Sequence, residues 1–403
     1  MSLTPVDAAL AALLKSVPGP TGTERLPLAD CIGRVLAEDL AALRTQPPFA
    51  NSAMDGYAAR AADLQPGRTL AVIGESAAGK RFSGAVGPGE AVRIFTGAPL
   101  PEGADAVLMQ EDAEGVGSPS IRVLAQVAPG RFVRAAGLDF SQGDRLLAAG
   151  RRLDPATLAL AAAMGHASLP VRRRPLVAIL ATGDELVSPG EETGPDQIVA
   201  SNGFALAALV AQAGGTPLDL GIARDDHADL AARIGAARRA GADVLVTLGG
   251  ASVGEHDLVR AALAAQGMTP GFWRIAMRPG KPMMTGVIER MVVLGLPGNP
   301  VSSIVCGHLF AVPLVEALLG LADPARDRSE RASIAVDLPA NDERQDYLRA
   351  TLEQGADGPV ATPFPRQDSS MLATMARADA LVVRPVNAPA AKAGDPCRIL
   401  RLR

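Results

Sequence analysis

Cysteine is scarce in this sequence: Cys31, Cys306 and Cys397 are the three that occur among 403 residues. An odd number of widely separated cysteines excludes a disulfide framework and the paired spacing of a structural zinc site. Aromatic residues make up 3% of the chain, whereas 48% of it is hydrophobic. The cores must therefore be filled mainly by alanine, leucine and valine. A chain of this length is expected to divide into about two to four domains.

The chain also lacks a strong excess of charge of either sign, with a formal net charge of −4 at pH 7. This balance argues against nucleic acid or an anionic membrane as the main partner, so an anionic ligand has to be bound by a local pocket. The apolar segments that start at Leu158 and Val305 are interrupted by polar residues or helix breakers, so neither is expected to span a membrane. The N-terminal residues have no secretory signal pattern, and we expect a cytoplasmic protein.

Alternating strands and helices are predicted between residues 174 and 322, because short apolar runs there are each followed by a helical pattern. The expected strands are residues 176–180, 217–222, 244–248 and 291–296. The expected helices are residues 203–213, 227–240, 258–265 and 301–319. This alternation is typical of an α/β domain with a central, doubly wound and mostly parallel sheet.

The segments on either side predict all-β modules. Short β-like runs separated by glycine predict a small inserted β domain at residues 46–145, and similar runs predict a C-terminal β domain at residues 323–403. Residues 1–45 and 146–173 each contain a predicted helix. If these two helices pack together, the two segments form one discontinuous helical and extended linker domain. The expected fold class is therefore α/β plus all-β modules.

Polar loops follow four predicted strands, and in a parallel sheet such loops meet at one edge. Three of them bring the carboxylates Glu185, Asp226 and Asp257, and the fourth is the turn at residues 297–300. Carboxylates that converge raise one another's pKa values unless a cation lies between them, and hard oxygen ligands favour Mg²⁺. Each loop alone also fits a plain strand–turn–helix in which Asp225 or Asp226 caps the helix that follows.

A basic turn supplies the opposite charge. Arg274, Arg278 and Lys281 lie close together in the sequence around a rigid Pro-Gly-Lys-Pro segment. Such donors match a tetrahedral oxyanion, although an ordinary basic surface turn has the same composition. We therefore expect one rim of the sheet to hold a phosphorylated ligand through Mg²⁺.

Seven motifs, in this order and spacing, resemble the molybdopterin molybdenumtransferases of molybdenum cofactor biosynthesis. They are NSAMDGYA, RIFTGAPLPEGADAVLMQED, ILATGDELV, GIARDD, TLGGASVGEHD, RPGKP and GLPGNPVSS. The resemblance covers essentially the whole chain, and the family is similar to the C-terminal domain of gephyrin. It implies an elongated homodimer of four-domain subunits that takes adenylylated molybdopterin and molybdate, releases AMP with Mg²⁺ and inserts the metal at the dithiolene. Further implied partners are a molybdopterin adenylyltransferase and the molybdoenzymes that accept the product.

The resemblance also implies roles for individual residues, by motif position. The functional polar residues would be Asp55, Thr96, Asp139, Glu185, Asp226 and Asp257, with the last three as metal ligands and Asp55 reaching the site of the partner subunit. The pterin-phosphate site would contain Gly249, Gly250, Ser252, Pro297, Gly298, Asn299 and Pro300. The molybdate site would contain Arg278, Lys281, Arg349 and Ser369.

The chain departs from the family pattern at several places. Leu138 stands where a glutamate is usual, Ala200 stands where an aspartate is usual, and arginine replaces lysine at positions 274 and 278. Asp368 replaces a glycine beside the expected molybdate site. Two other functions stay open at this point. One is a related molybdopterin adenylyltransferase or pyrophosphate-acting enzyme, and the other is a non-catalytic, gephyrin-like dimeric scaffold.

Overall fold

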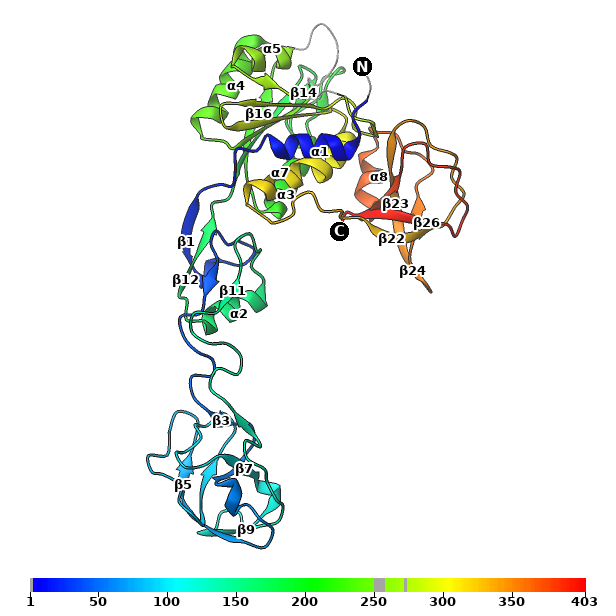
Figure 1. Ribbon diagram of the computed structural model, residues 1–403. Coiled ribbons are helices and arrows are strands. Elements are labelled where there is room, and N and C mark those ends of the chain that lie inside the picture. The colour runs from blue at the N-terminus through cyan, green and yellow to red at the C-terminus, as the bar shows by residue number, and fades with distance from the viewer. Residues whose placement is uncertain (1–2, 250–257, 272–273) are drawn as a thin grey trace.

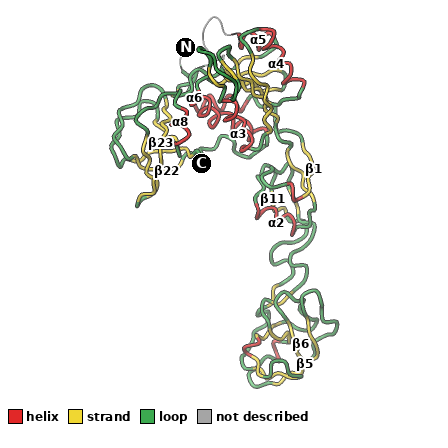
Figure 2. Tube along the Cα trace, turned by 180° about the vertical axis from the view of Figure 1, so that it is seen from behind, coloured by secondary structure: helices red, strands yellow, loops and turns green. Residues whose placement is uncertain are grey.

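The computed structural model describes residues 3–249, 258–271 and 274–403 and shows an elongated molecule (Figure 1). An α/β domain lies at one end with a C-terminal β domain packed beside it, and a narrow stalk leads to a second β domain at the far end. Figure 2 shows that most of the helical segments surround the α/β sheet, whereas the distal domain consists mainly of strands and loops. The predicted fold class, α/β plus all-β modules, is confirmed.

The α/β domain is built on a six-stranded sheet in the order β16-β13-β17-β21-β20-β18. The first four strands are parallel, and the last two join antiparallel. The strands are β13 (Leu176–Thr182), β16 (Thr216–Ala223), β17 (Val244–Leu248), β18 (Thr269–Pro270), β20 (Met284–Ile288) and β21 (Met291–Leu296). The four predicted strands are present. The antiparallel edge was not predicted, because β20 is a short run that contains a glycine.

Helices cover both faces of this sheet. One face packs against α1 (Val6–Lys15), α3 (Asn202–Ala213), α6 (Pro300–Cys306) and α7 (Val312–Leu318), and the other against α4 (His227–Arg239) and α5 (Leu258–Ala265). In β13, Val177 and Ile179 pack on the first face, and Ala178 and Leu180 pack on the second. Successive side chains of a strand point to opposite faces, so a continuous apolar run is what a strand buried on both sides requires.

The segment Pro300–Leu318 joins α6 to α7 through the π-helix η4 (Gly307–Ala311). It has 19 residues with a mean hydropathy of 1.7, and by length and composition alone it would be able to cross a membrane. However, 72% of it is buried inside the protein. Because a helix that is apolar all round is also what the core of a large domain contains, we interpret this segment as a core helix.

The stalk consists of two antiparallel strand pairs and one helix. β1 (Thr23–Pro27) pairs with β12 (Ser168–Arg172), β2 (Leu40–Ala41) pairs with β11 (Arg145–Leu147), and α2 (Pro155–Ala163) begins after a capping box at Asp154. The first helix, α1, does not join α2 as the predicted grouping of residues 1–45 required. It packs on α7, because its apolar stripe of Val6, Ala9 and Leu13 is buried in the α/β core.

A short ladder of β3 (Asn51–Ser52) and β10 (Val133–Arg134) connects the stalk to the distal β domain. That domain contains a six-stranded sheet in the order β7-β4-β6-β5-β9-β8. Its strands are β4 (Gly56–Ala59), β5 (Thr69–Ser76), β6 (Glu90–Ile94), β7 (Ala106–Met109), β8 (Ala113–Glu114) and β9 (Ser120–Val123). Short 3-10 turns occur at η1 (Leu28–Asp30), η2 (Ala61–Asp63) and η3 (Gln110–Asp112).

The sheet of the C-terminal β domain closes on itself, because its strands follow the order β23-β24-β22-β26-β25 and β25 pairs back with β23. Its elements are β22 (Glu330–Ile334), β23 (Gln345–Gly355), β24 (Gly358–Pro363), α8 (Leu372–Arg377), β25 (Ala380–Arg384) and β26 (Pro396–Arg401). β19 (Met277–Arg278), which precedes β20 in the chain, adds to this sheet alongside β23. Tyr347, Met375 and Leu381 are buried in the same core as α1 and α7, so this domain and the α/β domain form one packed unit.

Candidate functional site

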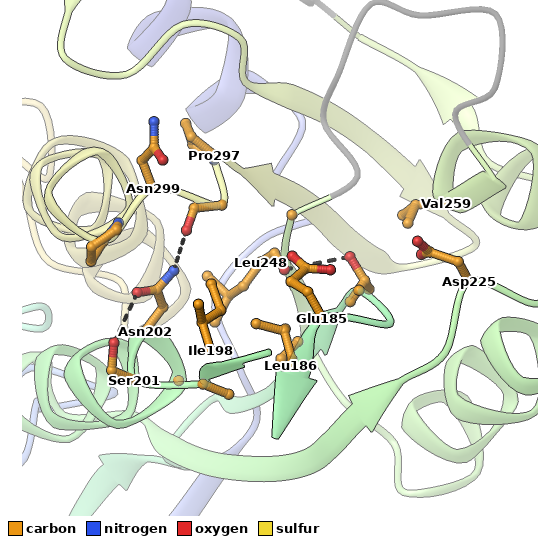
Figure 3. A pocket seen from close by; sticks show the side chains of 18 of the residues that line it. Glu185, Leu186, Ile198, Ser201, Asn202, Asp225, Leu248, Val259, Pro297 and Asn299 are labelled. Carbon is orange, nitrogen blue, oxygen red and sulfur yellow. Dashed lines mark hydrogen bonds between the residues drawn. The ribbon is translucent and has the colours of Figure 1, made fainter. Parts of the chain in front are cut away.

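A pocket of about 690 Å³ lies at the carboxyl ends of the parallel strands, where open α/β sheets bind their ligands. Its lining comes from the loops after β13, β16, β17 and β21, and from the small strand pair β14 (Leu186–Val187) and β15 (Ile198–Val199). Figure 3 shows Asp225 and Val259 on one side of the pocket, Pro297 and Asn299 on the other, and Glu185 between them. Loops that are far apart in the sequence thus meet at one rim.

Two glycines shape this rim. Gly183 has φ +145° and Gly249 has φ +100°, backbone conformations that glycine adopts without strain and other residues rarely adopt. A Cβ at Gly183 would lie 2.3 Å from the carboxylate of Glu185, and a Cβ at Gly249 would lie 2.8 Å from the carbonyl oxygen of Thr182. Glycine is therefore needed at position 249 for the loops after β13 and β17 to approach each other, and at position 183 mainly for its backbone conformation.

Carboxylates gather on one wall of the pocket. Glu185 and Asp225 line it, and Asp184 Oδ1 accepts a hydrogen bond from the backbone N–H of Asp225 at 3.1 Å. Desolvation raises the pKa of Asp225, and the negative charges of Asp184 and Glu185 raise it further. A cation bound between these side chains would relieve their repulsion.

Asp226, the expected metal ligand, does not line the pocket. Its Oδ2 accepts hydrogen bonds from the backbone N–H groups of Ala228 at 3.1 Å and Asp229 at 2.9 Å, which makes it the N-cap of α4. The carboxylate that joins Glu185 in the pocket lining is the preceding residue, Asp225. Sequence reasoning missed Asp225 because both aspartates follow β16, and the sequence does not show which one caps the helix.

The acidic wall has the right donors for Mg²⁺. Carboxylate oxygens are its preferred protein ligands, and it usually takes one or two of them and completes its shell with water and phosphate oxygens. Glu185 and Asp225 are the side chains that would hold it. Within the described ranges, no group of three or more His, Cys, Asp or Glu side chains is gathered for a metal ion. Binding would therefore depend on oxygens from the phosphorylated ligand.

The opposite wall is the turn at residues 297–300, which lines the pocket together with Gly249 and Lys281. Asn202, at the start of α3, donates from Nδ2 to the carbonyl oxygen of Gly298 at 2.7 Å. Ser303 Oγ donates to the carbonyl oxygen of Pro297. Side chains from two helices therefore fix the shape of the turn. Asn202 matches the last residue of the family motif that departs from its usual form at Ala200, but its contact with Gly298 could not be predicted because the two residues lie 96 positions apart.

Ser369 connects the C-terminal domain to this turn. Its Oγ accepts a hydrogen bond from Asn299 Nδ2 at 3.0 Å, and its carbonyl oxygen accepts one from the backbone N–H of Val301 at 3.1 Å. The carboxylate of Asp368 accepts from the backbone N–H of Ser370 at 2.8 Å and from its hydroxyl at 2.6 Å. These bonds to Ser370 lower the pKa of Asp368. The carboxylate is therefore held by hydrogen bonds within its own loop.

Arg349 on β23 is fully buried. Its Nε donates to Gln367 Oε1 at 3.1 Å, and its Nη1 donates to the carbonyl oxygen of Asp368 at 2.9 Å. Its Nη2 has no hydrogen-bond partner among the residues that the structure describes. Burial lowers the pKa of Arg349. A buried donor without a partner loses its hydration without compensation, and a bound anion would supply the missing acceptor.

Lys281 is part of the pocket lining, whereas Arg278, Arg349 and Ser369 are not. The guanidinium of Arg278 donates to Asp342 Oδ2 at 3.0 Å, to Asn341 Oδ1 at 3.3 Å and to the carboxylate of Asp346. The hydrogen bond to Asp346 and the charges of both aspartates raise the pKa of Arg278. The structure therefore places Arg278 in contact with the C-terminal domain and outside the lining of the pocket that it was expected to join.

Asp55, Thr96 and Asp139 lie away from the pocket. Thr96 donates to Asp55 Oδ1 from its backbone N–H at 2.7 Å and from its hydroxyl at 2.8 Å, and these bonds lower the pKa of Asp55. The backbone N–H of Asp139 donates to the carbonyl oxygen of Gln46 at 3.0 Å, on the connection between stalk and distal domain. Because the distal domain and the α/β domain are at opposite ends of the molecule (Figure 1), Asp55 cannot reach Glu185 of the same chain.

Three expected residues, Gly250, Ser252 and Asp257, follow β17 and lie outside the described residues.

The chain matches known families along most of its length. Residues 4–165 match the MoeA N-terminal region (domain I and II), residues 178–317 a probable molybdopterin binding domain, and residues 331–402 the MoeA C-terminal region (domain IV). The molybdopterin molybdenumtransferase of Haemophilus influenzae is 40% identical over 315 residues, which are 78% of each protein. That of a Nostoc species is 35% identical over 390 residues, 94% of this chain and 89% of the relative. The crystal structure of the molybdopterin biosynthesis MoeA protein from Pyrococcus horikosii superimposes with a TM-score of 0.85 and 33% identity over 100% of both chains. This chain therefore belongs to the molybdopterin molybdenumtransferase family.

Proposed function

We propose that this protein inserts molybdate into adenylylated molybdopterin and releases AMP, as a step of molybdenum cofactor biosynthesis. Membership of the transferase family supports the reaction. The observation in this structure that carries the proposal is a pocket lined by the carboxylates Glu185 and Asp225, by Lys281 and by the turn at residues 297–300. Carboxylates that can hold a divalent cation, in the same pocket as a cationic side chain and backbone groups, suit a pyrophosphate that must be bound and cleaved.

The rest of the pocket suits the remainder of such a substrate. Its volume of about 690 Å³ lies within the range of ordinary ligand pockets. Leu186, Ile198, Leu248 and Val259 add apolar surface to the lining, on which a flat heterocycle can pack. The polar groups would then fix the phosphates, and the apolar wall would orient the ring system.

Within this proposal, Mg²⁺ held by Glu185 and Asp225 would neutralise charge on the pyrophosphate and polarise the bond that breaks. Lys281, which also lines the pocket, would add a positive charge to the contacts of the same ligand. Arg349 has an unpaired Nη2 for an oxyanion, and Ser369 joins its domain to the pterin-phosphate turn. Molybdate bound by these two residues would lie beside the substrate, so proximity would replace a dilute encounter with a local one.

We also propose a homodimer in which the distal domain of one subunit completes the pocket of the other. The pair formed by Asp55 and Thr96 is already ordered by two hydrogen bonds, yet it lies far from the pocket of its own chain. In a closed two-fold dimer, each pocket would receive the distal domain of the other subunit in the same way. A cytoplasmic location fits the chemistry as well, because the dithiolene of the substrate and the free Cys31, Cys306 and Cys397 all favour a reducing compartment.

The reaction is tested by incubating the purified protein with adenylylated molybdopterin and measuring AMP by chromatography. AMP release should require both molybdate and a divalent cation, and chelation with EDTA should abolish it. Addition of Mg²⁺ to the chelated protein should restore it. AMP release that is indifferent to molybdate, or nucleotide transfer from ATP without molybdate, would instead support an adenylyltransferase or a pyrophosphate-acting enzyme.

Substitution of Asn202 by aspartate should weaken substrate binding more than it weakens the fold. The change removes the Nδ2 donor to Gly298 and sets a carboxylate against a carbonyl oxygen, a loss of about 1–3 kcal/mol at the turn. The KM for adenylylated molybdopterin should therefore rise about 10-fold or more, while the melting temperature falls by only a few degrees. Gln354→Glu makes the same change from amide to carboxylate at an exposed site of the C-terminal domain and serves as the control. An unchanged KM in Asn202→Asp would show that the turn is held without Asn202.

A further inference from the structure

The α/β domain and the C-terminal domain share one strand pair, formed by residues 277–278 and 345–346, which we call the crossing. β19 pairs in parallel with β23, which sets Arg278 opposite Asp346 in the register. The backbone N–H of Gln345 donates to the carbonyl oxygen of Ala276 at 2.8 Å beside this pair. The side chain of Asp346 is 8% exposed, whereas that of Arg278 is 45% exposed. The crossing therefore combines backbone pairing with a half-buried ion pair.

The charges around Arg278 are balanced within the crossing. Asp342 accepts from Arg278 at 3.0 Å and from Arg344 at 2.8 Å, and Asp346 accepts from Arg278. Two arginines thus face two aspartates. An oxyanion that approached Arg278 would meet the field of two carboxylates within ion-pair distance of the same guanidinium, which opposes its binding. Lys281, three residues further on, lines the pocket, whereas Arg278 does not.

We propose that Arg278 is a positioning residue that clamps the C-terminal domain onto the α/β domain and does not itself bind the oxyanion substrate. The inference rests on the proposed function, since the substrate in question is molybdate. The clamp fixes the N-terminal end of β23, and the same strand carries Arg349, which is buried with an unpaired Nη2. A forked guanidinium reaches acceptors on Asn341, Asp342 and Asp346 at once, which the single ammonium of a lysine matches poorly.

The two roles predict opposite effects of removing Asp346. If Arg278 is a clamp, then Asp346→Asn and Arg278→Gln damage the same contact. Each should raise the KM for molybdate about 10-fold and speed hydrogen exchange at the Gln345 amide. The double variant should be no worse than the more affected single variant, which corresponds to a coupling of about 10-fold, as for residues of one network. Arg331→Gln removes an exposed arginine of the C-terminal domain and should change neither quantity.

Two results would overturn the clamp. If Arg278 binds molybdate, Asp346→Asn frees its guanidinium and lowers the KM for molybdate, while Arg278→Gln raises it. If the two residues act independently, their effects multiply in the double variant. Should Asp346→Asn not fold, Asp342→Asn, at a carboxylate that is 36% exposed, gives the same test of sign. Absence of molybdate-dependent AMP release in the wild-type protein would count against the proposed function, and hydrogen exchange at Gln345 would still decide whether the clamp exists.

Discussion

Asp225→Asn is expected to lower molybdate-dependent AMP release by about 100-fold or more, the scale seen when a group that stabilises transition-state charge is removed. Asp225 lines the pocket with Glu185, and one of two carboxylates available to the cation would be lost. Asp226→Asn makes the same chemical change one residue later. Asparagine caps helices as well as aspartate does, so this variant should keep both its activity and its stability.

A third variant, Asp226→Ala, helps to separate activity from stability. Asp226→Ala removes the cap of α4 and should lower the free energy of unfolding by about 1 kcal/mol, with near-normal turnover. Asp225→Asn should raise the melting temperature of the ligand-free protein, because the pKa of Asp225 is raised by desolvation and by Asp184 and Glu185. A raised carboxyl pKa means that the ionised form destabilises the fold. The stability deficit of the wild type should therefore be present at neutral pH and disappear as the pH falls below about 3.9, the ordinary pKa of an aspartate.

Activity assays and thermal melts of the three variants are sufficient to decide this. Loss of AMP release in Asp226→Asn, with retention in Asp225→Asn, would return the metal-binding role to Asp226. A melting temperature of Asp225→Asn that falls at neutral pH would show that Asp225 forms a stabilising contact, in which case its proximity to Asp184 and Glu185 does not govern its energetics.

Periodicity in the sequence was sufficient to predict the α/β sheet, because β13 and β17 are buried on both faces and therefore read as continuous apolar runs. The position of α1 could not be predicted in the same way. Its stripe of Val6, Ala9 and Leu13 shows that one face is buried, but a stripe does not identify the surface that covers it. In the structure α1 packs on α7 of the α/β domain and not on α2. This contact joins segments that are about 300 residues apart in the sequence.

The candidate site shows the same limit at the level of side chains. Glu185, Lys281 and the turn at residues 297–300 were expected from their motifs, and all of them line the pocket. What the motifs do not contain is the partner of each side chain. Whether Arg278 is available to an anion depends on Asp342 and Asp346, which are more than 60 residues away in the sequence. A motif therefore shows which charged side chains the site can contain. Only the fold shows which of these side chains already form ion pairs within the protein.

If the protein forms the proposed homodimer, two inactive variants, Asp55→Asn and Glu185→Gln, are expected to restore activity when they are combined in one dimer. Each homodimer lacks one group at both sites. In the mixed dimer, the subunit with Asp55→Asn keeps an intact pocket, and the other subunit keeps an intact distal domain. One of the two sites is then complete. Random subunit exchange gives half mixed dimers, so roughly a quarter of the wild-type activity should return.

The matched control combines Glu185→Gln with Asp225→Asn. Both residues belong to the pocket wall of one chain, so every site in every dimer carries a defect and no activity should return. Co-expression with two different affinity tags allows the mixed dimers to be isolated and assayed for AMP release. If Asp55 acts on the pocket of its own chain, the first combination stays as inactive as the second. Because the distal domain and the pocket lie at opposite ends of the subunit (Figure 1), that outcome would require the stalk to fold back on the α/β domain.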